Sequence, residues 1–163
     1  MTNFPKADRM MIRTESRLIV AGTISDVWAY LCDVGRWAEW APTVLECRVR
    51  GGGQLQPGAW IEQRAEDLGW KHTRSERVTV VDPPNSMAFE GTMGTSVARW
   101  GMEFEPVDDG CTDAMMWVEV DMANVMRVIP GRALQRRIQR VSGIEMAAIK
   151  TAVESDSRAV GAP

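Results

Sequence analysis

The sequence predicts an α+β domain in which a curved antiparallel sheet of about seven strands wraps round a long C-terminal helix, with two short helices after the first strand. Three observations lead to this fold class. An amphipathic helical pattern follows the first strand, six short β-type runs fill residues 44–121, and one long helical run begins at Arg132. Such a sheet has one apolar face, and the last helix is the element long enough to cover it. A cavity between the two is therefore expected.

The first three elements lie before residue 43. Residues 11–20 alternate loosely between polar and apolar types, which predicts a strand. Thr23 followed by Asp26 resembles a capping box, and apolar residues at one-face helical spacing continue to Val34, so we expect one helix over this stretch. A short helical turn over 37–40 should end there, because a proline soon follows.

The central half of the chain consists of short β-type runs separated by turn residues. The predicted strands cover residues 44–50, 59–65, 70–81, 87–92, 96–105 and 112–121. Mostly hairpin-length loops separate them, which favours an antiparallel meander. We expect the closing helix over residues 132–154, a frayed tail over 155–163, and one domain over 1–163 with its core at about 13–154.

Composition excludes several classes of protein. Hydrophobic residues make up 45% and charged residues 25% of the chain, which is typical of globular domains and unlike disordered or fibrous ones. The net charge of -3 gives no overall basicity for nucleic acid or an anionic membrane. No apolar run approaches the ~18 residues of a membrane span. Three scattered cysteines without a CxxC pair favour reduced thiols and a cytoplasmic protein.

The few histidine and cysteine residues argue against a metal site, and no cofactor-binding motif is present. One histidine and three separated cysteines give no metal-site spacing, and the glycine triplet at 51–53 lacks the GK[ST] of a phosphate-binding loop. We therefore expect no metal and no cofactor. A monomer or homodimer is expected.

Several segments point to a family. They are "TISDVWAYLCDVGRWAEWAPTVLECRV" after the first strand, "VTVVDPP", "FEPVDDGCT" and the closing "IEMAAIKTAVE". With these segments the chain resembles the polyketide cyclase/dehydrase and lipid-transport family of the START-like (SRPBCC, helix-grip) superfamily over residues 13–154. The resemblance implies a helix-grip fold with a hydrophobic ligand cavity. It leaves the activity open, since the superfamily includes cyclases, aromatases, and lipid and quinone binders.

Strand 70–81 carries a candidate catalytic group. Alternation places His72, Arg74 and Glu76 on the same face as Val78, which we expect to point inward. Proton abstraction beside a carbonyl needs a base with a pKa near neutrality and a cation for the enolate oxygen, and this triplet has those types. The alternative is that Arg74 neutralises Glu76, or a carboxylate on the closing helix, without chemistry.

That carboxylate is Glu145. With Leu134 at zero and about 100° per residue, a buried stripe forms and Glu145 falls at about 20°, inside it. The stripe contains Leu134, Ile138, Val141, Ala148, Ile149 and Ala152, with Ser142 near its edge. Glu145 either sits at an open cavity mouth or pairs with an arginine, or it is a cavity-lining acid/base or ligand anchor.

Large apolar side chains are expected to line the cavity. The predicted ligand contacts are Trp37, Trp40, Val78, Phe89, Trp100, Met102, Met116, Leu134, Ile138, Val141 and Ser142. The first two tryptophans come from the short helical turn, and Trp100 and Met102 alternate on one face of a strand. Methionines suit an adaptable pocket, although ordinary core packing explains both residue types equally well.

Five arginines form the one basic patch of the sequence, with no acidic residue between Met122 and Ile144. They are Arg127, Arg132, Arg136, Arg137 and Arg140. The patch is either a solvated helix face or a dock for something acidic, such as a ligand phosphate, a lipid headgroup or an acyl carrier protein held by Arg132, Arg136 and Arg140.

Two function hypotheses follow, with a third behind them. In the first, the protein encloses a largely apolar small molecule and catalyses cyclisation, dehydration or aromatisation of a polyketide-like substrate without a cofactor. In the second, it is a non-catalytic binder or carrier of a lipid, quinone or isoprenoid. The third is a protein-interaction module that acts through the arginine patch.

Overall fold

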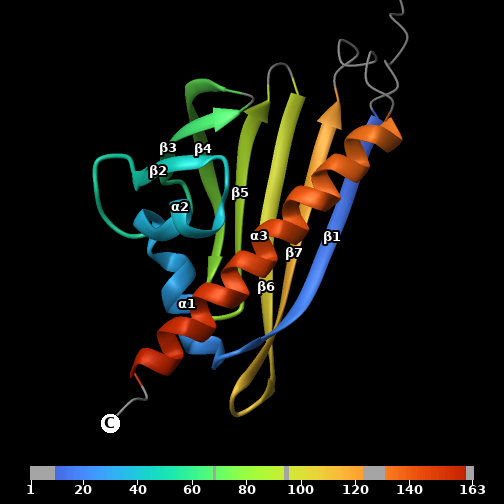
Figure 1. Ribbon diagram of the computed structural model, residues 1–163. Helices are drawn as coiled ribbons and strands as arrows, with labels where there is room; N and C mark the ends of the chain where they lie inside the picture. Colours follow the sequence, from blue (N-terminus) through green and yellow to red (C-terminus); the bar gives the residue numbers. More distant parts are fainter. Residues whose placement is uncertain (1–9, 68, 94–95, 123–130, 161–163) are drawn as a thin grey trace, which may run out of the picture.

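The computed structural model describes residues 10–67, 69–93, 96–122 and 131–160. Its strands are β1 Met10–Ala21, β2 Val44–Val49, β3 Trp60–Asp67, β4 Trp70–Asp82, β5 Ser86–Met93, β6 Ser96–Asp108 and β7 Cys111–Met122. They form one antiparallel sheet in the order β1-β7-β6-β5-β4-β3-β2 (Figure 1). The predicted seven-stranded antiparallel sheet is confirmed.

The helices are α1 Ile24–Cys32, a 3-10 turn η1 Val34–Arg36, α2 Trp37–Trp40 and α3 Gly131–Val160. The capping box of α1 is confirmed, because Thr23 and Asp26 exchange hydrogen bonds at the helix start. The prediction that this helix reaches Val34 is wrong. Asp33 leaves the helical region at φ -79 and ψ 87, and its carboxylate accepts a hydrogen bond from Gly35 N. This side chain competes with the helix for the backbone amide and starts η1.

Helix α3 lies across the concave face of the sheet, alongside β1 (Figure 1). Its side chains bind the free edge of β1: Gln139 Nε2 donates to the Glu15 carbonyl oxygen at 2.7 Å, and Glu154 Oε1 accepts from Ala21 N at 2.9 Å. These bonds satisfy edge groups that a neighbouring strand would otherwise bind, and they fix the rotation of the helix. The apolar stripe of α3 therefore faces the sheet.

The C-terminal end of α3 differs from expectation. The helix continues to Val160, so the prediction that it ends near Glu154 is wrong. Arg36 forms an ion pair with Asp156, and the Ser155 hydroxyl donates to the Thr151 carbonyl oxygen at 2.7 Å. These contacts bind the last turns of α3, and the composition of residues 155–163 does not reveal them.

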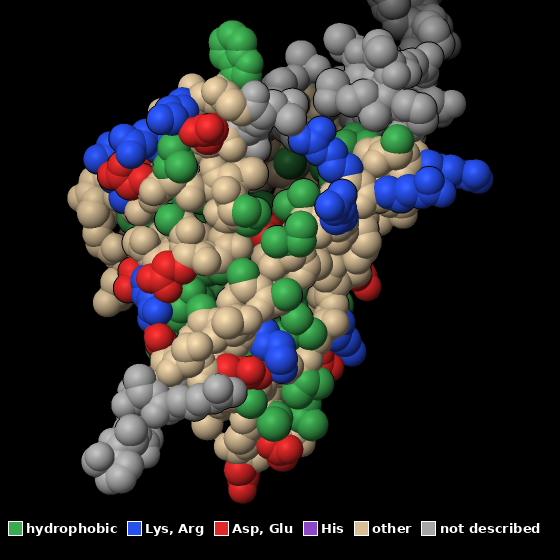
Figure 2. Space-filling model, viewed as in Figure 1, with side chains coloured by type: hydrophobic (Ala, Val, Ile, Leu, Met, Phe, Trp, Pro, Cys, Tyr) green, Lys and Arg blue, Asp and Glu red, His purple; other side chains and the backbone are tan. Residues whose placement is uncertain are grey.

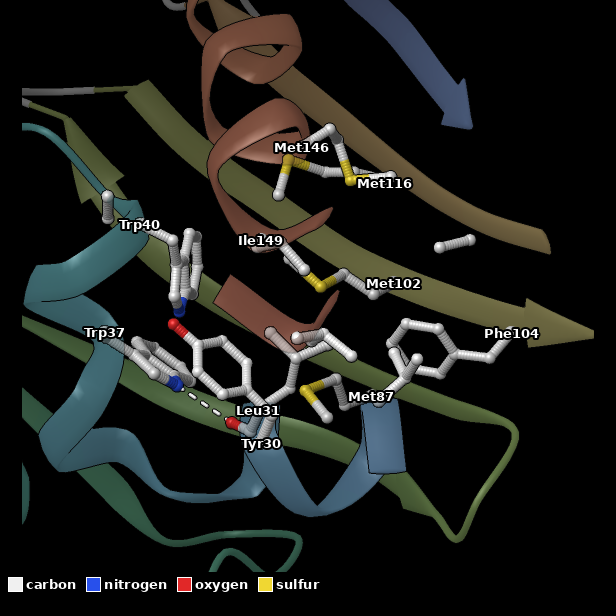
Figure 3. Packing of buried hydrophobic residues seen from close by; sticks show 14 of the residues in the cluster. Tyr30, Leu31, Trp37, Trp40, Met87, Met102, Phe104, Met116, Met146 and Ile149 are labelled. Carbon is white, nitrogen blue, oxygen red and sulfur yellow. Dashed lines mark hydrogen bonds between the residues drawn. The ribbon is translucent and has the colours of Figure 1, made fainter. Parts of the chain in front are cut away.

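The main core lies between the inner face of the sheet and the helices. Figure 3 shows Met102 and Met116 from the sheet beside Met146 and Ile149 from α3. Leu134 and Ile149 of the predicted stripe are buried and its other four members are half-buried, while Met146 and Val153 are buried positions that the prediction did not include. In the described part of the chain, no helix has an apolar stretch long enough to cross a membrane.

Candidate functional site

Strand register places the polar group of β4 on the inner face of the sheet. Arg74 pairs with Gln63 and Glu76 pairs with Ile61 across β3 and β4. Gln63 and Ile61 are buried. Because paired residues in a sheet point to the same face, Arg74 and Glu76 share this inner face, as the alternation predicts.

A chain of hydrogen bonds connects these side chains. Arg74 Nε donates to Gln63 Oε1 at 2.6 Å, and Gln63 Nε2 donates to Glu76 Oε2 at 3.2 Å. Trp100 Nε1 donates to the same Glu76 oxygen at 3.0 Å. Arg74 Nε also lies 3.9 Å from Glu76 Oε1, so the expected Arg74–Glu76 ion pair is present.

Glu145 reaches the same region from α3. The pKa of its carboxyl is raised to about 7: burial is the main cause, the Arg74 guanidinium opposes it, and the nearby charge of Glu76 adds to it. Burial also raises the pKa of Glu76, against Arg74 and the hydrogen bonds from Trp100 and Gln63. Two carboxyl groups and one guanidinium from β4 and α3 are thus electrostatically coupled.

The other candidate catalytic residue, His72, has a different environment. It follows the alternation onto the inner face, where its partner Ala65 is buried, but the His72 side chain is exposed. Its Nδ1 lies 3.4 Å from the Trp70 carbonyl oxygen, toward the β3–β4 turn. The structure therefore places His72 at the rim, two positions from Arg74.

A thiol completes the surroundings of the carboxylates. Cys47 on β2 pairs with Gln63 and is buried. The pKa of the Cys47 thiol is raised to about 12, mainly by burial and in smaller part by the charge of Glu76. The thiol is protonated at neutral pH, which makes it an apolar neighbour and a poor nucleophile.

Most of the expected ligand contacts lie between the sheet and the helices. Val78, Phe89, Met102, Met116, Trp37 and Trp40 are buried in the main core. Trp100 is half-buried and stacks on Phe89 with ring centroids 4.3 Å apart. Trp37 Nε1 donates to the Leu31 carbonyl oxygen at 2.9 Å, which gives this residue a structural role. Contact of this set with a ligand stays a prediction.

Two of the four expected contacts on α3 belong to a small second cluster. Leu134 packs with Ile12 and Val120 in a small second cluster that Ile138 joins. Ser142 is buried and Val141 is half-buried in the middle of the helix, one turn before Glu145. These positions continue the inner surface from the N-terminal half of α3 to the carboxylates.

The described surface has a hollow of about 500 Å³ where β1 and α3 both begin. It is lined by Met11, Ile12, Arg13, Gly131, Arg132 and Gln135. Figure 2 also shows a recess beside basic side chains near the N-terminal half of α3, with a hydrophobic side chain at its base. The expected cavity between the sheet and the stripe from Leu134 to Ala152 stays a prediction.

Sequence reasoning missed two residues of the site. Gln63 lies between Ile61 and Ala65 on the inner face of β3, so a polar residue at an apolar alternating position was the available signal. The second is Gly91 on β5. A Cβ at this position would lie 3.0 Å from Glu76 Cγ, so the glycine leaves room for Glu76 to reach across β5.

The arginine patch lies on the surface of α3. Arg132, Arg136, Arg137 and Arg140 are exposed, and no ion pair to them is found among the described residues. Arg127 lies outside the described residues. Exposure of this kind fits a solvated helix face, and a docking role stays a proposal. Residues 10–67, 69–93, 96–122 and 131–160 contain no cluster of three or more His, Cys, Asp or Glu side chains suited to a metal ion.

The fold is that of a helix-grip protein. The chain superposes on the Zhui aromatase/cyclase from Streptomyces sp. R1128 with a TM-score of 0.76 at 17% identity, covering 94% of this chain and 100% of that one. A START superfamily protein from Mycobacterium smegmatis superposes with a TM-score of 0.71 at 13% identity, over 88% of this chain and 98% of that one. Norcoclaurine synthase from Thalictrum flavum superposes with a TM-score of 0.65 at 14% identity, over 93% of this chain and 99% of that one. At these identities the likeness establishes the fold.

The family follows from the sequence. A model of the polyketide cyclase/dehydrase and lipid transport family matches residues 11–154, and the chain belongs to this family. A search of curated proteins gave no match.

Proposed function

We propose that the protein binds a largely apolar small molecule between the sheet and α3, and that it catalyses cyclisation, dehydration or aromatisation of a polyketide-like substrate without a cofactor. One observation carries the proposal. The hydrogen-bonded Arg74, Gln63 and Glu76 face Glu145 beside an otherwise apolar inner surface. Such convergence of coupled ionisable groups is typical of acid–base sites.

The two carboxyl groups divide the proton transfers. Glu76 accepts two hydrogen bonds and forms an ion pair with Arg74. It is the base that takes a proton from the carbon beside a substrate carbonyl. Glu145, whose pKa of about 7 keeps much of it protonated near neutrality, gives its proton to the departing hydroxyl oxygen. The C–H electron pair becomes the new C=C bond, the C–O bond breaks, and water leaves.

Arg74 stabilises the charge that develops between these two steps. Its side chain is 35% exposed, and its Nε is held by Gln63, which leaves the two terminal nitrogens of the guanidinium to donate to an enolate oxygen. Trp100 and Phe89 present stacked rings next to the carboxylate, a surface suited to a planar or ring-forming substrate.

The test compares turnover with ligand affinity in single variants. Glu76→Gln and Glu145→Gln should each lose roughly 10²–10⁴-fold in turnover of a polyketide-like substrate while still binding it. His72→Ala is the matched comparison at the rim and should lose less. If all three variants turn over at the parental rate, proton transfer by these side chains is wrong.

A second candidate function is a non-catalytic binder or carrier of a lipid, quinone or isoprenoid. The Arg74–Glu76 ion pair favours it, because a neutralised pair gives a polar anchor without chemistry. Native mass spectrometry of the purified protein separates the two functions. A co-purified lipid or quinone, together with full ligand affinity and no turnover, supports the carrier.

Two finer points complete the proposal. Arg132, Arg136 and Arg140 are exposed on α3, so a substrate carried by an acidic acyl carrier protein has a basic surface to approach. The cytoplasm is the proposed location, since Cys32, Cys47 and Cys111 are all free thiols.

A further inference from the structure

We infer that Gln63 is a positioning residue that decides which of the two coupled carboxyl groups carries the proton: it holds Glu76 as the ionised member and leaves the proton on Glu145. This inference deepens the proposed function and rests on it for its catalytic meaning. The hydrogen bonds of the cluster carry it.

The orientation of the Gln63 amide is fixed by its neighbours. Arginine can only donate hydrogen bonds and an ionised carboxylate can only accept them. Gln63 Oε1 therefore faces Arg74 Nε at 2.6 Å, and Gln63 Nε2 faces Glu76 Oε2 at 3.2 Å. Turning the amide over would place N–H against N–H and oxygen against oxygen, so the bridge transmits the polarity of Arg74 to Glu76.

The two carboxyl groups differ in the donors that they receive. Glu76 accepts from the Gln63 amide and from the Trp100 indole, and its other oxygen faces Arg74 at 3.9 Å. Among the described residues, no hydrogen bond or ion pair to Glu145 is found. Hydrogen bonds to a carboxylate favour its charged form, whereas burial without them favours the protonated form. The donors are thus concentrated on one member of the pair.

The remaining groups around Glu76 do not change this assignment. The charged and titratable neighbours are Arg74 on its own strand, Glu145 on α3 and the thiol of Cys47 on β2. The Cys47 pKa of about 12 keeps that thiol neutral. One arginine then faces two carboxyl groups, and a single negative charge balances it, which leaves the second carboxyl group protonated.

The experiment follows both carboxyl groups by NMR across pH, in protein labelled with 13C at the glutamate side-chain carboxyl. Glu76→Gln and Glu145→Gln assign the two resonances. In the parental protein Glu76 should titrate below Glu145. Gln63→Met removes the amide at similar length and should narrow the gap between the two midpoints by about one pH unit or more. Gln139→Met is the matched control, because that glutamine binds the β1 backbone and contacts neither carboxyl group.

Each outcome has a distinct meaning. A parental protein in which Glu145 titrates below Glu76 overturns the inference without any Gln63 variant. An unchanged gap in Gln63→Met, or in the shorter Gln63→Asn if the first variant does not fold, overturns it as well. Loss of turnover in Glu145→Gln with an unchanged gap leaves the proposed function standing. A narrowed gap with parental turnover in Glu145→Gln supports the role of Gln63 and rejects the catalytic function.

Discussion

The indole nitrogen of Trp100 donates a hydrogen bond of 3.0 Å to the carboxylate of Glu76, although the two residues lie on strands separated by β5. The bond spans β5 above Gly91, where a side chain would meet Glu76 Cγ at 3.0 Å. The aromatic cluster of Trp100 and Phe89 is thereby joined to the charged cluster on β4. Polar and apolar halves of the inner surface meet at this contact.

Replacing Glu145 by glutamine should stabilise the protein at alkaline pH. The folded pKa of about 7 lies above the ~4.3 of an unfolded glutamate, so the folded state keeps a proton that the unfolded state has lost. Stability of the parental protein therefore falls as pH rises between these values, by about 3 kcal/mol. Urea unfolding at pH 5, 6.5 and 8 should show that the free energy of unfolding of the variant, relative to that of the parental protein, increases with pH. Glu103→Gln, at an exposed position, is the control. A difference in unfolding free energy between Glu145→Gln and the parental protein that does not vary with pH would contradict the prediction.

Two glycines on the inner strands should respond differently to alanine. A Cβ at Gly101 would lie 2.7 Å from the Met87 carbonyl oxygen, which cannot move aside, so Gly101→Ala should cost about 1–3 kcal/mol or more. At Gly91 the Cβ would meet the flexible Glu76 side chain instead. Gly91→Ala should cost less stability but shift the Trp100 indole NH resonance. Thermal unfolding measures the two stability losses, and 1H–15N spectra follow the Trp100 indole NH resonance. Equal stability losses in the two variants, with no shift of that resonance in Gly91→Ala, would contradict the prediction.

Trp37 should behave as a structural residue. Its ring is buried against Phe89 with centroids 5.2 Å apart, and its indole donates to Leu31. We expect Trp37→Ala to lose about 3–5 kcal/mol of unfolding free energy. Trp37→Phe, which retains a ring and loses the hydrogen bond, should lose about 1–3 kcal/mol. Denaturant unfolding measures both, and a loss below about 1 kcal/mol in the alanine variant would be inconsistent with this role.

The end of α3 should loosen when Asp156 loses its charge. Arg36 binds Asp156 and lowers the pKa of that carboxyl, so the contact is complete above the ordinary aspartate pKa and is lost as pH falls through the lowered value. Asp156→Asn should speed amide exchange in the last turns of α3 at low salt. Because both side chains are partly exposed, 1 M salt should reduce the difference. Exchange that is equally slow in both proteins at low salt would show that the ion pair is dispensable.

Removing the exposed arginines should change association and not folding. Substituting Arg132, Arg136 and Arg140 by glutamine leaves the buried stripe intact, so thermal unfolding should stay near the parental value. If an acidic carrier protein delivers the substrate, its association should slow and depend less on salt. Stopped-flow binding at several salt concentrations checks this. Unchanged association at low salt would identify the patch as a solvated helix face.

Local pattern was enough for most of the elements and for the position of one buried carboxyl group. Strand alternation fixed the inner face of β4, because a period of two repeats whatever the strand packs against. The capping pair of Thr23 and Asp26 fixed the start of α1 within one turn of chain. The helical period placed Glu145 in the buried stripe, and the structure finds it coupled to Arg74 and Glu76.

Contacts between distant segments decided what the pattern could not. The bridge from Arg74 through Gln63 to Glu76 depends on the register between β3 and β4, and sequence alternation does not contain register. The end of α3 depends on Arg36, more than a hundred residues earlier in the chain. Burial of each ionisable side chain depends on how far α3 stands from the sheet, and bonds from Gln139 and Glu154 to β1 help to hold it there. The sequence by itself therefore determined which side chains face inward, and the tertiary structure decided which of them meet, because proton affinity is set by neighbours in space.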